Sequence, residues 1–487
     1  MIDLLCLNLP YEYPFEISGF SRPSRSPCKT RGGTIYYPIS LATMLSYART
    51  LGYKGKLIDC VARKYKSADL FKAIRVLKPR FIVIDTSTPS IKNDIKIADE
   101  IQKKNPKTVV ILVGRHVTYA PKETLKSCKE VKIVSRKEYY KSVIDLLDGK
   151  DYHHVNGITY KENEKIFHNK DQELIDPDKL GFISKIYKNE LDIKNYFYAS
   201  TFNPYLLLQV GWGCPYNCSF CNEVVKSSYR HRSVENVIEE LKFIEKKLPQ
   251  VKEIYWDDPT FVVDEEFTKE LCDSMIKNKI KIKWSCVTRA NISLDLLKIM
   301  KKANARTMHI GLESSSQGSL DFIHKNMRFE EEMKYLRDCE KVGIKNHACW
   351  IFGLPGDTKK SLEKTIEIGK HLPSVDSMQC FPLIPTPFED IFDKESYGTI
   401  WKYLTENNYL TTRDYSKWLK PNGFYNCVVN YPQLSSEEIE NMIEKFYREF
   451  YFNPSYIFYK ARQSISNIEE LKRNFRGFKT LLERSKI

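Results

Sequence analysis

Three cysteines stand close together in the chain: Cys214, Cys218 and Cys221. Glycine and proline interrupt the segment that holds them, residues 211–222, which favours a loop. Three thiolates at this spacing can bind three irons of a 4Fe-4S cube and leave the fourth iron without a protein ligand. An open iron is a place where a small molecule can bind and react. The sequence therefore predicts a 4Fe-4S cluster with these cysteines as its metal ligands and as the catalytic centre.

Two other uses of the three cysteines remain as alternatives. A structural zinc site would need a fourth Cys or His to complete a tetrahedron, and no second cysteine pair follows at zinc-finger spacing. Cysteines can also pack as small apolar side chains in a core. The cluster is the preferred interpretation because the chain has no second cysteine pair at the spacing that a zinc site would require.

The cysteine loop comes directly after a short apolar run, residues 205–210, which reads as a buried strand. From there the chain alternates strands and helices, with helices at residues 234–247 and 294–303 after Ser233 and Ser293 as caps. The predicted strands are residues 205–210, 253–256, 282–287, 307–310, 347–352 and 378–383. Six such units predict an open partial (β/α)6 barrel with its site at the carboxyl ends of the strands.

The Cys-x3-Cys-x2-Cys spacing, with the aromatic Phe220 just before the last cysteine, resembles the signature of the radical S-adenosylmethionine (SAM) superfamily. The resemblance implies that the open iron binds the amino and carboxylate groups of SAM. It also implies that one electron, from a donor such as flavodoxin or ferredoxin, splits SAM to give a 5'-deoxyadenosyl radical.

By the same resemblance, the residues that follow the predicted strands are expected to contact SAM. These are Asp257, Asp258, Arg289, Glu313, Ser314 and Gly353. An aspartate can hold the ammonium group, an arginine can hold the carboxylate, and the acid–serine pair suits the ribose hydroxyls. Two alternatives stay open. The aspartates can simply begin a helix, and the turn after Gly353 is also a good helix start.

Residues 1–150 predict a second parallel α/β unit, a doubly wound, Rossmann-like (flavodoxin-like) sheet. The predicted strands are residues 2–8, 56–60, 81–85, 108–113 and 131–134, and the predicted helices are residues 38–51, 68–77, 91–103 and 137–147. Such sheets bind ligands in the crevice beyond the carboxyl ends of the strands.

A five-stranded unit placed directly before the cysteine loop resembles the cobalamin-binding domain of cobalamin-dependent radical SAM enzymes. The loops at the crevice edge then supply the implied cobalamin contacts: Thr86, Ser87, Gly114, Arg115, His116 and Ser135. The Asp-x-His-x-x-Gly element that ligates cobalt from below in other cobalamin proteins is missing, so we expect no histidine below the corrin. The alternative is a Rossmann-like domain that packs without a ligand.

The remaining segments predict a linker with a hairpin at residues 151–200 and, after a barrel at residues 201–400, a helical region at residues 401–487. An apolar stripe at residues 468–482 is expected to pack on the protein itself. The connection before residue 34 ends in Thr34-Ile35-Tyr36-Tyr37-Pro38, which is similar to a subgroup with hopanoid-associated members. A flexible surface loop is the alternative for this connection.

Composition sets broad limits. With 487 residues and 42% hydrophobic residues, the chain is expected to form two or three domains. Its 77 Lys and Arg against 62 Asp and Glu give a net charge of +15, but bases and acids alternate, which favours a solvated surface over a nucleic-acid partner. The 13 cysteines are mostly scattered, and no apolar run of membrane-spanning length occurs. We therefore expect no membrane span and a reduced, cytoplasmic setting.

Together these features predict a cobalamin-dependent radical SAM enzyme that methylates an unactivated carbon of a small-molecule or peptide substrate. A non-methylating radical reaction, reductive or ring-forming, is one alternative. An RNA methylthiotransferase would need three N-terminal cysteines for a second cluster, whereas Cys6, Cys28, Cys60 and Cys128 lie in separate elements. A non-catalytic cobalamin or redox sensor would not need so many SAM-pocket candidates.

Overall fold

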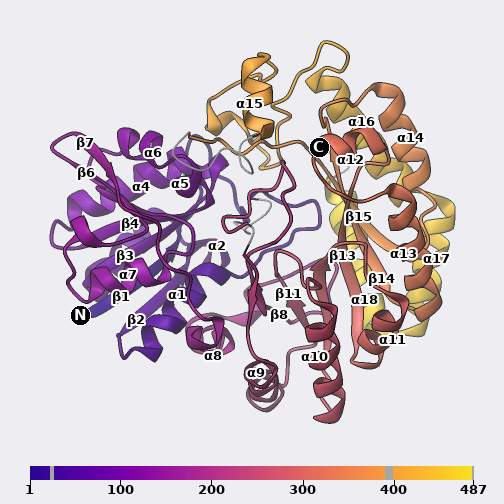
Figure 1. Cartoon of the computed structure of the whole chain (residues 1–487), viewed down its shortest axis with the longest axis horizontal. Coiled ribbons are helices and arrows are strands. Elements are labelled where there is room, and N and C mark those ends of the chain that lie inside the picture. The colour runs from indigo at the N-terminus through magenta and orange to yellow at the C-terminus, as the bar shows by residue number, and fades with distance from the viewer. Residues whose placement is uncertain (22–26, 227, 390–398, 485–487) are drawn as a thin grey trace.

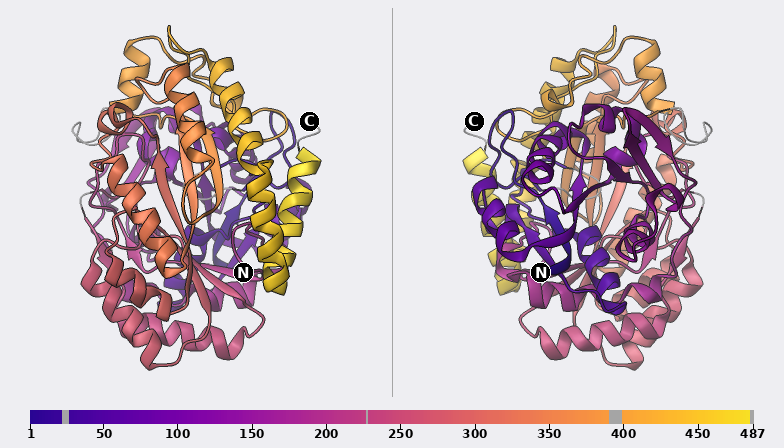
Figure 2. Two further views of the ribbon diagram at one scale, coloured as in Figure 1. Left: turned by 90° about the vertical axis from the view of Figure 1, so that its right-hand side faces the viewer. Right: turned by 90° about the vertical axis from the view of Figure 1, so that its left-hand side faces the viewer.

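The computed structural model describes residues 1–21, 27–226, 228–389 and 399–484. Two sheets stand side by side with helices around them (Figure 1). The first is built from residues 2–168 and the second from residues 205–382. The helices from residue 436 onward pack beside the second sheet (Figure 2).

The first sheet has seven strands in the order β2-β1-β3-β4-β5-β6-β7. The first five are parallel to their neighbours, as predicted for a flavodoxin-like sheet. The β6–β7 hairpin joins antiparallel to β5, so the hairpin predicted in the linker extends this sheet. The strands are β1 (Ile2–Asn8), β2 (Gly55–Asp59), β3 (Pro79–Thr86), β4 (Val109–Gly114), β5 (Ile133–Ser135), β6 (Ile158–Glu162) and β7 (Lys165–His168).

Eight α-helices accompany this sheet in the described residues. They are α1 (Ile39–Thr50), α2 (Cys60–Arg63), α3 (Ser67–Leu77), α4 (Ile91–Lys104), α5 (Arg115–Tyr119), α6 (Pro121–Ser127), α7 (Tyr140–Leu147) and α8 (Ile183–Glu190). Helix α1 is buried around most of its circumference, because it packs on β1 and β2 and also on α8, which in turn contacts β8 of the second sheet. Its neighbour Tyr37 donates a 2.9 Å hydrogen bond to the carbonyl of Tyr205. One continuous apolar core therefore joins both sheets.

The second sheet is fully parallel, in the order β15-β14-β13-β12-β11-β8. Its strands are β8 (Tyr205–Leu208), β11 (Glu253–Trp256), β12 (Lys283–Thr288), β13 (Ala305–Glu313), β14 (Lys345–Phe352) and β15 (Val375–Pro382). The intervening helices are α9 (Val234–Lys247), α10 (Glu265–Lys277), α11 (Leu294–Lys302), α12 (Gln317–Phe322), α13 (Phe329–Val342) and α14 (Lys359–Gly369). Ser233 and Ser293 cap α9 and α11 as predicted. Six parallel units with β8 and β15 as edges form the predicted open barrel.

The C-terminal helices in the described residues are α15 (Thr399–Glu406), α16 (Ser436–Tyr451), α17 (Pro454–Ser466) and α18 (Ile468–Arg484). Helix α16 packs on β15 and α14, and α17 pairs with α18. The expectation that the stripe after residue 468 packs on the protein is wrong: Ile468 is 60% exposed and Phe475 is 70% exposed. None of the described helices is both long and apolar enough to cross a bilayer.

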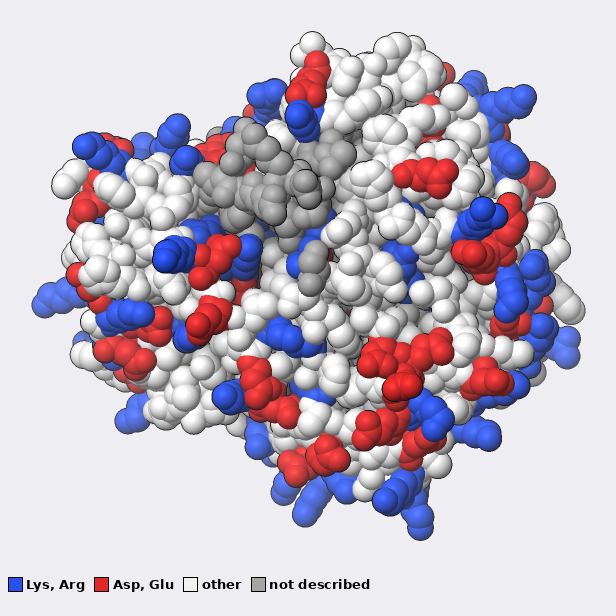
Figure 3. Space-filling model, in the orientation of Figure 1, with Lys and Arg blue, Asp and Glu red and all other residues white. Residues whose placement is uncertain are grey.

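Lys and Arg lie intermixed with Asp and Glu over the face in Figure 3. This is the pattern of a solvated surface, as the sequence predicts for this charge balance.

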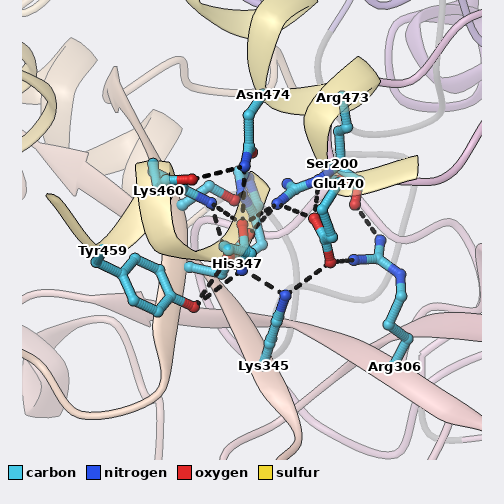
Figure 4. A network of polar contacts seen from close by, with 12 residues as sticks. Ser200, Arg306, Lys345, His347, Tyr459, Lys460, Glu470, Arg473 and Asn474 are labelled. Carbon is cyan, nitrogen blue, oxygen red and sulfur yellow. Dashed lines mark hydrogen bonds and ion pairs between the residues drawn. The ribbon is translucent and has the colours of Figure 1, made fainter. Parts of the chain in front are cut away.

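A buried ionic network attaches α17 and α18 to the barrel at the amino ends of its strands (Figure 4). The carboxylate of Asp376, on β15, lies 2.8 Å from Lys460 on α17 and 2.8 Å from Arg473 on α18. Burial alone would raise the pKa of Asp376, but Arg473, Lys460 and Lys345 hold it well below its usual value. Asp376 is therefore an anion that neutralises cations from three elements.

Replacing this anion tests how much the network contributes. We expect Asp376→Ala to lower the free energy of unfolding by about 3–5 kcal/mol, because it leaves buried cations without their counter-ion. Urea unfolding followed by circular dichroism measures the change. The control is Asp295→Ala, which removes a solvent-exposed pair with Lys298 and should change stability little. Equal effects of the two substitutions would contradict this role of the network.

Candidate functional site

A cavity of about 410 Å³ lies between the carboxyl ends of the two sheets. Its wall includes the loops after β3 and β4 of the first sheet, the cysteine loop, and the ends of the barrel strands. Ten of the residues predicted from the sequence line it: Cys214, Cys218, Cys221, Asp257, Arg289, Glu313, Thr86, Ser87, Gly114 and Arg115. The fold thus brings residues from both predicted binding regions to one space.

The cysteine loop is held by backbone geometry that requires glycine. The short strands β9 (Gly211–Trp212) and β10 (Arg230–His231) pair across its base. Gly213 then adopts a left-handed conformation with φ of 79°, and a Cβ atom there would collide with the carbonyl oxygen of Ser228. The next residue, Cys214, donates its N–H to the carbonyl of Val225 at 3.0 Å. The loop therefore enters the cavity in one fixed direction.

The surroundings of the cysteines suit metal-bound thiolates. Burial raises the pKa of Cys214 to about 12, so the thiolate needs a positive partner. Lys226 donates from Nζ to the carbonyl of Cys218 at 3.2 Å, and Nη1 of Arg289 lies 3.5 Å from Sγ of Cys218. Arg289 thus stands beside a sulfur atom, and the charge of Lys226 acts to lower the pKa of Cys221 against the effect of burial. Both cations would offset the negative charge of a thiolate-bound cluster.

The three cysteines lie on one loop at the cavity wall. This suits a 4Fe-4S cube, which takes one thiolate for each of three irons. Among the described residues, no group of three His, Cys, Asp or Glu side chains could hold a single metal ion.

Three residues predicted to contact SAM surround the cavity from neighbouring strands. Asp257 follows β11, and its N–H bonds to the carbonyl of Leu208 at 2.8 Å. Glu313 ends β13 with φ of 62°, a left-handed conformation that is uncommon for a residue other than glycine. Its carboxylate lies 3.3 Å from Nζ of Lys325. The guanidinium carbon of Arg289 lies 4.0 Å from the centre of the Tyr216 ring. These contacts fix two carboxylates and a guanidinium on the wall.

Two other predicted SAM contacts hold backbone instead of lining the cavity. A carboxylate oxygen of Asp258 accepts hydrogen bonds from the N–H groups of Val210, at 3.0 Å, and Gly211. It therefore fixes the start of the cysteine loop. Ser314 accepts from the N–H of Ser316 at 3.1 Å, just before α12. A direct contact of either residue with SAM stays a prediction.

The turn at Gly353 follows β14 and leads to α14, which begins at Lys359 after its cap Thr358. The carboxylate of Asp357 accepts from the N–H groups of Gly353 and Leu354 at 3.1 and 3.0 Å. The hydroxyl of Tyr431 donates to the carbonyl of Gly353 at 2.8 Å, and a Cβ atom on Gly353 would crowd Ile439 of α16. Gly353 is thus enclosed by the C-terminal region and lies outside the cavity lining, and its contact with adenine stays a prediction.

Some of the residues predicted at the cobalamin crevice line the cavity, and others do not. Thr86, Ser87, Gly114 and Arg115 line the cavity. His116 is 1% exposed, its Nδ1 lies 3.2 Å from the hydroxyl of Thr88, and burial lowers its pKa to about 3. It is therefore a neutral, enclosed side chain.

The positions of Gly114 and Ser135 at the crevice are explained by their neighbours in the fold. A Cβ atom on Gly114, whose φ is 108°, would collide with Asp85 and with the carbonyl of Thr86. The glycine thus lets β4 end close beside β3. Ser135 is fully buried and is not part of the cavity lining, and its hydroxyl lies 3.5 Å from the carbonyl of Gly157. A cobalamin contact from His116 or Ser135 stays a prediction.

Arg115 has a role that the sequence does not reveal. It begins α5, directly after β4, and its guanidinium reaches across to the cysteine loop. Nη2 lies 3.1 Å from the carboxylate of Glu223, and Nη1 donates to the side-chain and backbone oxygens of Asn222. The Tyr119 hydroxyl, from the same helix, donates to the carbonyl of Glu223. The first domain therefore holds the segment that follows Cys221.

A polar aromatic group on the far wall also escapes the sequence analysis. Tyr198 contacts the His309 ring nitrogen through its hydroxyl at 3.0 Å, and its ring lies 5.0 Å from that of Tyr36. Tyr36, Tyr198, Tyr255 and His309 all line the cavity. Tyr36 lies in the segment Thr34-Ile35-Tyr36-Tyr37-Pro38 before α1, and Tyr198 lies in the connection before β8. Neither position indicated a direction, so only the alternation of Tyr255 and His309 along their strands could have indicated an inward one.

Comparison with known proteins decides the family. Residues 29–139 match the B12 binding domain, and residues 208–368 match the radical SAM superfamily. The chain belongs to the radical SAM enzymes that carry a B12-binding domain. It is 28% identical to an uncharacterized methyltransferase of Pyrococcus horikoshii, over 89% of this chain and 91% of the relative.

This cobalamin-type radical SAM enzyme also has more distant relatives. It is 24% identical to the anaerobic magnesium-protoporphyrin IX monomethyl ester cyclase of Rubrivivax gelatinosus, over 87% of this chain and 75% of the cyclase. Its fold is similar to that of the radical SAM methyltransferase TsrM of Kitasatospora setae, with a TM-score of 0.62 and 13% identity over 79% and 73% of the two chains.

The cofactors of this family are a 4Fe-4S cluster, SAM and cobalamin, in agreement with the two matched domains. The residues present fit them. Three thiols and two cations suit the cluster, and a cavity bounded by the carboxyl ends of both sheets suits SAM on one side and a corrin on the other.

The glycine before the first cysteine gives a direct test of the loop. We expect Gly213→Ala to lower the iron and sulfide bound per chain after anaerobic reconstitution, because the new Cβ atom displaces the loop from Ser228. The control is Gly318→Ala, at a position in α12 with room for a methyl group. Normal iron content in Gly213→Ala, with unchanged melting temperature, would contradict the need for this turn.

The contact made by Arg115 predicts a defect at the cluster. In Arg115→Ala the buried Glu223 loses its cation, so the loop after Cys221 should loosen and the reduced cluster should show an altered electron paramagnetic resonance signal. Glu223→Gln should produce the same change, and the double variant should add little to either. If Arg115 acts only on cobalamin, Arg115→Ala loses corrin while Glu223→Gln does not.

Proposed function

We propose that this enzyme methylates an unactivated carbon of a small-molecule or peptide substrate. One observation carries the proposal: the cysteine loop, the ends of the barrel strands and the crevice of the B12-binding domain line a single cavity. A substrate in that cavity is within reach of both cofactor regions without leaving the protein. When bound, the cluster and SAM supply a 5'-deoxyadenosyl radical and cobalamin supplies a methyl group.

The side chains on the barrel side would bind and orient SAM. Asp257 offers a carboxylate for the ammonium group. Glu313, held by Lys325 at 3.3 Å, offers acceptors for the ribose hydroxyls. Arg289, next to Cys218, offers donors for the SAM carboxylate. With these roles, Arg289 would hold the amino acid end of SAM beside the cysteine loop.

The rest of the wall suits a substrate with an apolar body and few polar groups. Phe381, Ile384 and Tyr425 line the cavity together with Trp350 and Ile351. Tyr198 and His309 place hydrogen-bonding groups among them. Mostly apolar walls with a few fixed polar groups are typical of small-molecule sites, and they exclude water from a radical intermediate.

An external electron donor, flavodoxin or ferredoxin, would supply the electron.

The products of turnover test the proposal. The reconstituted protein is incubated without oxygen with a reductant, methyl-labelled SAM and a low-molecular-mass extract of the producing cells. We expect both S-adenosylhomocysteine and 5'-deoxyadenosine, and a labelled methyl group on carbon in one extract component. Cys218→Ala should abolish deoxyadenosine, because the cluster loses a ligand, and its retained cleavage of SAM would overturn the radical mechanism.

A non-methylating radical reaction is the second candidate, because the cyclase relative covers most of this chain. Its outcome is distinct in the same experiment. 5'-Deoxyadenosine would form and one extract component would be converted, but no S-adenosylhomocysteine would appear and no labelled methyl group would be transferred.

A further inference from the structure

Helices α17 and α18 turn apolar faces to solvent. The exposed fractions reach 72% for Phe458, 89% for Ile465 and 70% for Phe475. The other large apolar side chains of this face are Ile457, Ile468, Leu471 and Phe478. On α18, residues 468, 471, 475 and 478 recur at helical spacing and so form one stripe. The two helices pack side by side on the outside of the barrel (Figure 2), so their stripes form one outward face.

The opposite faces of the same helices are charged and buried. Glu470 and Arg473 of α18 are 5% and 8% exposed. Glu470 lies 2.7 Å from Lys345 at the start of β14, and Arg473 lies 2.8 Å from Asp376 at the start of β15. Figure 4 shows these side chains pointing inward with Lys460 of α17. The α17–α18 hairpin thus buries charged side chains and exposes apolar ones, the reverse of the usual arrangement. The ionic network fixes this orientation.

Basic side chains border the apolar face. Arg462, Lys472, Arg476 and Lys479 are exposed beside it. The nearby acid Glu469 is already neutralised, because Lys252 and Lys472 lie 3.1 and 3.4 Å from its carboxylate. Arg476 also covers Phe197, with its guanidinium carbon 3.4 Å from the ring centre. The border therefore carries excess positive charge.

We propose that the outward face of the α17–α18 hairpin binds the surface of an anionic lipid bilayer. Apolar side chains enter the boundary between headgroups and acyl chains, while a row of Lys and Arg contacts the phosphates; this combination is the usual composition of interfacial helices. A second copy of the chain is the less favourable occupant, because pairing the same face by a two-fold axis brings two basic borders together. The bilayer then contacts the hairpin at the amino ends of the barrel strands, whereas the cavity lies at their carboxyl ends.

Vesicle sedimentation tests the proposal with the full-length protein. The probes are vesicles of phosphatidylcholine alone and of phosphatidylcholine mixed with phosphatidylglycerol. We expect the protein to sediment with the anionic vesicles and to be released by high salt. Phe475→Ser/Phe478→Ser should lose this binding. Lys472→Glu/Lys479→Glu should weaken it at least about tenfold.

The matched control is Val76→Ser, which removes an apolar side chain that is 78% exposed on α3 of the other domain, and its binding should equal that of the unmodified chain. Circular dichroism and cluster content confirm that the variants fold. Absence of the unmodified protein from the anionic vesicles would overturn the proposal. So would a dimer in analytical ultracentrifugation that Phe475→Ser/Phe478→Ser converts to monomer without any vesicle binding, since that result assigns the face to a second copy.

Discussion

The site depends on the apolar contact that holds the two parallel sheets together. Helix α1 is buried on nearly all sides because it serves both as a covering helix of the first sheet and as part of the core shared with the barrel. A parallel sheet places its binding loops at the carboxyl ends of its strands. With the sheets fixed through α1 and α8, both sets of loops border the same cavity. A hinge in place of this core would separate the two binding regions.

Within that frame, the cysteine loop is positioned from both sides. The barrel supplies the turn at Gly213 and the carboxylate of Asp258. The first domain supplies Arg115 and Tyr119, which hold Asn222 and Glu223 just after the last cysteine. Because one loop is anchored in two domains, a shift between the domains also shifts the three cysteines. The position of these cysteines and the shape of the crevice in the B12-binding domain are therefore coupled by geometry.

Much of the fold follows from the sequence, because buried parallel strands are short apolar runs separated by amphipathic helices. All five parallel strands of the first sheet and all six of the barrel overlap the predicted runs, although their ends differ, and β5 shares only residues 133–134 with its run. Helix α5 was not predicted, since five residues after a glycine have too little periodicity to distinguish a helix from a loop. The membership of β6 and β7 in the first sheet was also hidden, because it depends on pairing with β5 and not on the hairpin itself.

The site was less accessible to prediction than the fold. Asp257 and Asp258 are adjacent acids of the same type, yet one lines the cavity and the other holds backbone. Sequence alone does not say which carboxylate turns inward. Tyr36 and Tyr198 reach the cavity from connections more than 150 residues apart, so no local pattern joins them. Motif spacing predicted the three cysteines, because a cluster with these ligands requires one short loop; the structure brings all three to the cavity wall, and their binding of the cluster stays a prediction.

The hairpin α17–α18 shows why periodicity does not give orientation. A helix with an apolar stripe and a charged stripe normally buries the former, but a half-turn of α18 would leave Asp376 and Lys345 buried without Arg473 and Glu470. Unpaired buried charges are more costly than exposed apolar side chains. The partners that decide the matter lie on β14 and β15, about a hundred residues earlier in the chain. An apolar face exposed for this reason is held in a fixed orientation, which is the condition for a surface that binds another apolar boundary.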